Sequence, residues 1–121
     1  MDSMVAHYTV AKRRREKDSY SPGGKMGLRP DRAITVYTKR IRKISGKPII
    51  IGGIEASLRR FAHYDYWKDE VLPSVLEDSG ADLLVYGMGE RALLEIARRF
   101  SEEKTVLQMQ DIRGICYLVE P

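Results

Sequence analysis

Short apolar runs along the chain predict three β-strands. They cover residues 48–52, 82–86 and 114–119, and each run is too short for a helix. Apolar and polar residues do not alternate within them, so both faces of each strand should be buried, as is usual for parallel strands. The pattern therefore predicts three neighbouring parallel strands.

Apolar residues spaced three and four apart predict helices around these strands. The first helical pattern spans residues 30–45, and its apolar stripe consists of Ile34, Tyr37, Ile41 and Ile44. A stripe of this kind usually faces a protein core.

Two more helical patterns follow the first and second predicted strands. Residues 66–79 carry apolar residues at helical spacing, and Pro73 must either kink this helix or begin a second one, which Gly80 ends. Residues 89–103 form the most regular pattern, with an apolar stripe of Leu93, Ile96, Ala97 and Phe100.

Strands that alternate with helices of this length indicate right-handed crossovers and a parallel sheet with helices on both faces. We therefore predict an α/β fold, part of a doubly wound, Rossmann-like or flavodoxin-like, three-layer sandwich. Only three strands are predicted, whereas doubly wound domains usually have more. Residues 30–121 would then be an incomplete α/β domain, part of a longer parent protein.

Residues 1–29 form an irregular, basic N-terminal segment in this interpretation. A short helix can form around Met4 and Tyr8, but Pro22 and the glycines near it break regular structure. We expect residues 11–29 to be poorly ordered when the chain is isolated.

Charge is unevenly distributed over the chain. The net charge of +4 divides into about +10 on residues 12–47 and about −6 on the remainder. A segment this basic could bind an anion or a nucleic acid. It could equally be a solvated loop, or a surface that docks onto acidic residues of the same protein.

The composition is that of a soluble globular domain, with 43% hydrophobic and 31% charged residues. No apolar run approaches the ~20 residues that a membrane helix needs, and no signal peptide is recognisable. The single cysteine, Cys116, lies in an apolar run and is interpreted as a core residue. The default compartment is therefore the cytoplasm, with no membrane partner.

Glycine and acidic residues follow the first two predicted strands, at the strand ends where parallel sheets bind ligands. Glycine there lets a ligand approach the backbone, and the following helix offers free N–H groups. The candidate ligand-binding residues are Gly52, Gly53, Glu55, Ser57, Gly87, Gly89 and Glu90.

Simpler roles exist for all of these residues. The glycines can form tight turns without a ligand, and each glutamate can stabilise a helix N-terminus. Neither segment matches a dinucleotide-binding fingerprint or a P-loop. His7 and His63 stand at no metal-ligand spacing, so we predict no metal site and no catalytic residue in this chain.

The order "PIIIGGIEAS", "ADLLVYGMGERALLEIARRF" and "IRGICYL" resembles the cobalamin-binding-like domain that precedes the catalytic barrel in many radical-SAM proteins. In addition, "MDSMVAHYT", "SPGGKMGLRPDRA" and "GGIEASLRRFAHYDYW" resemble the YgiQ family of radical-SAM proteins, a resemblance that covers nearly the whole chain.

The resemblance implies a parent protein that uses S-adenosylmethionine and a [4Fe–4S] cluster. The C-x₃-C-x₂-C motif that binds such a cluster is absent here, so neither cofactor is expected in this chain. The cobalamin motif Asp-x-His-x-x-Gly is also absent, which leaves only binding without a histidine ligand.

Two functions remain open from the sequence. The first is an accessory domain that covers, or presents substrate to, a radical-SAM barrel elsewhere in the same parent chain. The alternative is a nucleic-acid-binding module that uses the basic residues 12–47.

Overall fold

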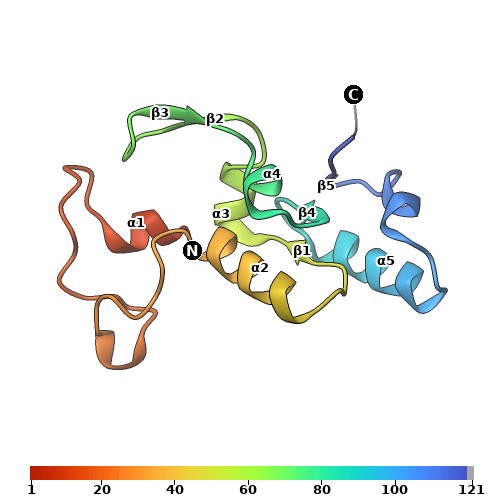
Figure 1. Ribbon diagram of the computed structural model, residues 1–121, viewed down its shortest axis with the longest axis horizontal. Coiled ribbons are helices and arrows are strands. Elements are labelled where there is room, and N and C mark those ends of the chain that lie inside the picture. Colours follow the sequence, from red (N-terminus) through yellow and green to blue (C-terminus); the bar gives the residue numbers. More distant parts are fainter. Residues whose placement is uncertain (120–121) are drawn as a thin grey trace.

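The computed structural model describes residues 1–119 (Figure 1). Its helices are α1 (Ser3–His7), α2 (Ala33–Ile44), α3 (Gly53–Leu58), α4 (Val75–Ser79) and α5 (Glu90–Ser101), with 3-10 turns η1 (Pro22–Gly24) and η2 (Val106–Met109). Its strands are β1 (Ile50–Ile51), β2 (His63–Asp65), β3 (Glu70–Leu72), β4 (Leu83–Val85) and β5 (Ile115–Cys116).

The central sheet has the strand order β1-β4-β5. β1 and β4 run parallel, with Ile50 opposite Leu83 and Ile51 opposite Leu84. The α/β fold and the parallel pairing of the first two predicted strands are therefore confirmed.

The third strand differs in direction from the prediction for residues 114–119. β5 is antiparallel to β4, with Ile115 opposite Val85. After α5, the chain passes through η2 and returns to the carboxyl end of β4, where the Tyr86 N–H donates to the Gly114 carbonyl at 3.0 Å. β5 thus begins where β4 ends, because the connection after α5 runs back along the sheet before the strand forms.

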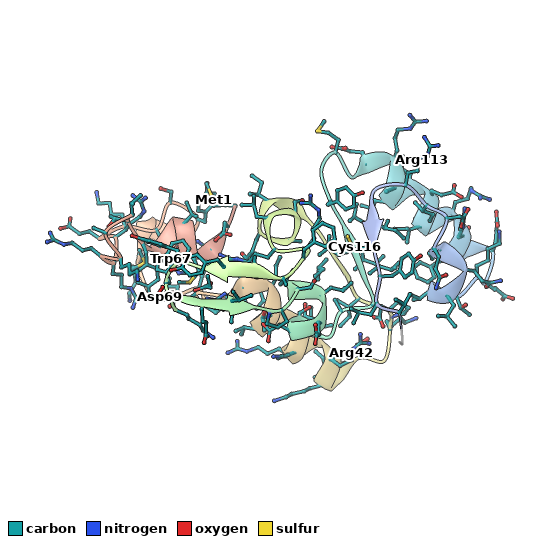
Figure 2. The ribbon with its side chains drawn as sticks, turned by 90° about the horizontal axis from the view of Figure 1, so that it is seen from above. Met1, Arg42, Trp67, Asp69, Arg113 and Cys116 are labelled. Atoms are coloured by element: carbon teal, nitrogen blue, oxygen red, sulfur yellow. The ribbon has the colours of Figure 1, made fainter. Side chains whose placement is uncertain are left out.

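Helices cover both faces of this sheet (Figure 2). The core on the side of α2, α3 and α4 consists of Ile51, Ala56, Val75, Leu76, Ala81 and Leu84. The core on the side of α5 and η2 consists of Leu83, Val85, Ala92, Ile96, Met109 and Ile112. Neighbouring residues of β4 belong to different cores, because successive side chains of a strand point to opposite faces.

A β-hairpin of β2 and β3 occupies part of the region where a helix was predicted at residues 66–79. The Asp65 carboxylate closes its turn by accepting a hydrogen bond from the Lys68 N–H at 2.8 Å. Val71, which fitted the helical spacing, is 73% exposed on β3. The turn chemistry of Asp65 therefore prevails over the apolar spacing.

Pro73 separates this hairpin from α4. It follows β3 directly, and Ser74 then caps α4 by accepting a hydrogen bond from the Leu76 N–H at 3.2 Å. Gly80 ends α4 in the left-handed conformation, as predicted.

The two long helices form where they were predicted, but they bury less of their stripes. On α5, Ala92 and Ile96 are buried while Leu93 is 52% exposed. On α2, Ile34 packs against the core, but Ile44 is 87% exposed. Within residues 1–119, no helix has both the length and the apolarity needed to cross a membrane.

A buried carboxylate organises the N-terminal segment. Asp18 accepts hydrogen bonds from Arg29 Nε at 2.7 Å, from Ser21 Oγ at 2.7 Å and from the Tyr20 N–H at 3.0 Å. The Nε2 atom of the buried His7 lies 3.4 Å from the same carboxylate. The hydrogen bonds from Arg29 hold the pKa of Asp18 well below its usual range.

The hairpin and the N-terminal segment lie together at one end of the molecule, opposite α5 (Figure 2). The Tyr66 hydroxyl donates to the Val10 carbonyl at 2.7 Å, and the Lys12 ammonium lies 4.8 Å from the centre of the Tyr66 ring. These contacts, together with those of Asp18, give the irregular segment specific partners.

We predict that Asp18→Asn loosens residues 11–29. Because the fold holds the pKa of Asp18 below its ordinary value of 3.8, the ionised carboxylate stabilises the fold above pH 3.8, and this stabilisation is lost as the pH falls. The amide of Asn cannot ionise, so the substitution removes the stabilisation at every pH. Limited trypsin digestion of the 121-residue chain at neutral pH should cut this lysine- and arginine-rich segment at least several-fold faster. Glu16→Gln, in the same segment but exposed, should behave like the unchanged chain.

Equal cleavage rates for the Asp18→Asn variant and the unchanged chain would contradict this role. Rapid cleavage of the unchanged chain would instead support the sequence-based expectation that residues 11–29 are poorly ordered in isolation.

Candidate functional site

The glycine-bearing carboxyl ends of β1 and β4 lie at the same end of the sheet, because the two strands are parallel. A cavity of about 390 Å³ opens at this end of the sheet. It is lined by Ile50, Ile51, Gly52, Gly53, Val85, Gly87, Gly89, Glu90 and Leu93. We call these residues the glycine rim. Five of the seven sequence-predicted site residues belong to it.

Gly53 and Gly87 are the two open positions of the glycine rim. Their φ angles are +82° and +67°, which side chains rarely adopt, and no neighbour lies within 4 Å of a Cβ built on either. Both residues are therefore glycine for backbone reasons, and the space above them is free for another molecule or domain.

Gly52 and Gly89 instead have packing roles. A Cβ at Gly89 would lie 2.6 Å from Val85 Cγ1, closer than real contacts. A Cβ at Gly52 would lie 3.3 Å from the Val85 carbonyl oxygen. The start of α5 and the end of β1 can approach β4 only because these side chains are absent.

Ser57 connects the two glycine loops through hydrogen bonds. Its hydroxyl donates to the Gly53 carbonyl at 2.8 Å and accepts a hydrogen bond from the Gly87 N–H at 3.1 Å. Ser57 does not line the cavity itself. Its position supports a role in holding the glycine rim.

The two glutamates have different environments. Glu90 is exposed in the first turn of α5, near the positive end of the helix dipole, and lines the cavity. Glu55 is buried and lies outside the cavity lining. Its carboxylate accepts hydrogen bonds from the Ser3 N–H at 3.0 Å and the Ser3 hydroxyl at 2.7 Å.

Arg59 completes a buried charge cluster with Glu55. Its guanidinium lies 3.6 Å from Glu55 and 2.9 Å from Asp2, which caps α1. Buried charges are stable only when they are paired, so this cluster fixes the first residues of the chain against α3. Glu55 thus anchors the N-terminus and does not contribute to the cavity wall.

The cavity walls include four apolar residues that sequence reasoning left out of the site: Ile50, Ile51, Val85 and Leu93. Leu93 had been assigned to the buried stripe of its helix. The better signal was the spacing of Ala92, Ile96 and Phe100, which places Leu93 beside the buried face.

Neither histidine lies at the glycine rim. His7 is buried beside Asp18 and Asp31, and His63 lies on β2. Residues 1–119 contain no group of three histidine, cysteine or acidic side chains that could hold a metal ion.

Four of the 13 cations in the basic segment 12–47 pair with carboxylates of the protein. Arg29 pairs with Asp18 inside the segment, whereas three cations pair with carboxylates outside it. These pairs are Arg32 with Asp65 at 2.5 Å, Arg42 with Asp82 at 2.6 Å, and Lys39 with Asp78 at 3.4 Å. The contacts favour the interpretation that the segment docks onto acidic residues of the same protein.

This geometry defines an α/β domain whose glycine-bearing strand ends form a cavity at the carboxyl end of the parallel strands. Residues 1–121 match the family model described as Radical SAM N-terminal, and the chain belongs to this family. The resemblance to YgiQ-family radical-SAM proteins is thereby confirmed.

Its relatives are UPF0313 proteins of bacteria. The chain is 53% identical over 119 residues to one from Clostridium botulinum, 57% over 115 residues to one from Geobacter sulfurreducens, and 52% over 118 residues to one from Thermotoga neapolitana. These matches cover 94–98% of this chain but only 19–21% of the relatives, so the chain spans about a fifth of their length. No solved structure matches the chain.

We predict that Gly89→Ala destabilises the protein by about 1–3 kcal/mol, the usual cost of forcing extra atoms into a packed site. In a Val85→Ala background the clashing methyl group is absent, so the same substitution should cost at least about 0.5 kcal/mol less. Urea unfolding of the unchanged protein, the two single variants and the double variant measures this coupling. Strictly additive effects would show that Val85 is not the reason for glycine at this position.

We also predict no tight binding of nucleic acid by this chain, because several cations of residues 12–47 already have carboxylate partners. Titration with tRNA should show weak binding that falls steeply as salt rises. Submicromolar affinity at physiological salt would contradict the prediction.

Proposed function

We propose that this chain is an accessory domain of a radical-SAM protein. In this proposal its glycine rim faces a catalytic barrel located elsewhere in the parent chain, and the domain covers the barrel or presents substrate to it. The observation that carries the proposal is the open cavity at the strand ends, where Gly53 and Gly87 leave free space.

The position of the cavity supports this role. Ligands of open α/β sheets sit beyond the carboxyl ends of parallel strands. The cavity has mainly apolar walls, and Glu90 is its one ionisable side chain among the described residues. Such a surface suits an apolar contact with another domain, or a ligand held mostly through its shape.

The cofactors of the parent would be held outside this chain. S-adenosylmethionine and a [4Fe–4S] cluster are implied by the family, but a cluster needs three thiolates and this chain has one cysteine. Burial raises the pKa of the Cys116 thiol, which packs against the core and stays protonated at neutral pH. The residues of this chain therefore do not fit the cluster.

Cobalamin binding remains part of the proposal only in a restricted form. No histidine lies among the residues of the glycine rim, so none is placed to coordinate cobalt there. A corrinoid would have to bind through the glycine loops and the apolar walls alone.

Photo-crosslinking in the full-length parent protein tests the orientation of the glycine rim. Met88 lies between the two glycines of the second loop and is 88% exposed. With p-benzoylphenylalanine at this position, we expect cross-links to the region that carries the cluster-binding cysteines. Leu107 in η2, which is 77% exposed but lies outside the glycine rim, is the matched control and should not give them.

Cross-links from position 107 but not from position 88 would show that another surface faces the barrel. No cross-link from position 88 in a protein with an intact cluster would also overturn the proposal.

A further inference from the structure

β1 is an edge strand in the described residues, with β4 as its single neighbour. Edge strands leave backbone N–H and C=O groups unpaired, and soluble proteins usually protect them with charges, prolines, bulges or a covering segment. Within β1 both side chains are isoleucine, and Ile49 precedes them. The strand itself therefore carries no charge or proline that would discourage pairing.

An apolar groove follows β1 on the side of α2. It measures about 330 Å³, and its lining includes Ile49 and Ile50 of the strand region and Tyr37 and Ile41 of α2. Tyr37 is 42% exposed and Ile41 is 45% exposed, although both belong to the stripe that the sequence assigns to a core. The exposed part of this stripe lines the groove beside β1.

The other face of β1 is also bordered by apolar side chains. The cavity of the glycine rim shares Ile50 and Ile51 with the groove, and its far wall includes Leu93 of α5. The free edge of β1 therefore lies between an apolar wall from α2 and an apolar wall from α5. One additional strand would be covered on both faces at this position, as central strands of α/β sheets are.

We infer that this position is filled by an extended apolar segment of the longer parent polypeptide, one that precedes the residue numbered Met1 here and pairs with β1. The relatives are about five times as long as this chain, so they contain ample sequence for such a segment.

The location of Met1 identifies the side from which this segment arrives. Met1 lines the groove, and the N-terminus lies beside the first turn of α2 (Figure 1). A chain that runs into Met1 from the groove does not have to cross the fold. The charge cluster of Asp2, Glu55 and Arg59 would hold in place the residues that directly follow that segment.

This inference does not rest on the proposed function. An added strand would fill the groove, whose lining includes Gly52 and Gly53, whereas Gly87, Gly89 and Glu90 line the cavity of the glycine rim and not the groove. A failure of the cross-link from position 88 therefore leaves the strand inference intact, and the reverse also holds.

Hydrogen exchange of the full-length parent protein tests the strand. We expect the β1 amides to exchange at least about 100-fold more slowly than in a version that lacks the segment preceding Met1, because strand pairing and burial protect amides. Similar rates in the two proteins would overturn the inference, as would protection already complete in the shorter one.

Substitutions in the intact parent keep the test decisive if the shortened protein does not fold. Ile41→Gln places a polar group against the added strand and should speed exchange in β1 by about tenfold or more. Arg40→Gln, on the exposed face of α2, should not. Equal effects of the two substitutions would contradict the inference, and protection that depends on protein concentration would assign the groove to a second copy instead.

Discussion

The structure depends on the burial of β4 from both sides. Leu83 and Leu84 are fully buried and belong to the two different cores, so this central strand joins the layers of the sandwich. Because β4 is central, the direction of β1 beside it decides where the glycine loops meet. Parallel pairing brings Gly53 and Gly87 to the same end of the sheet, and the cavity of the glycine rim follows from that constraint.

Buried charges attach the N-terminal segment to this sandwich. Asp2 and Glu55 share the guanidinium of Arg59, and Asp18 is enclosed by Arg29 and its own loop. Removing Arg59 would leave two buried carboxylates without their cation, and removing Arg29 would leave the buried Asp18 without its cation. The segment therefore depends on a few specific polar contacts, whereas the sandwich depends on apolar area. Glu55 connects the two parts, because α3 begins at the glycine rim.

The sequence predicted those features that local pattern determines. Apolar runs ending in glycine identified β1, β4 and the glycines of the glycine rim, and the helical spacing identified α2 and α5. It missed what depends on distant partners. The direction of β5 is set by the path of the chain through η2, and Asp65 at the hairpin turn is bound by Arg32, 33 residues away. Glu55 gave no local sign that its partner would be Ser3, 52 residues away.

The exposed stripe of α2 shows a different kind of disagreement between pattern and structure. Ile34 is packed as predicted, whereas Tyr37 and Ile41 continue the same stripe over open space. In natural proteins, local pattern and final packing usually agree. Under the inference of an added strand, the exposed part of this stripe marks the place that the strand would fill. Here that place is the free edge of β1.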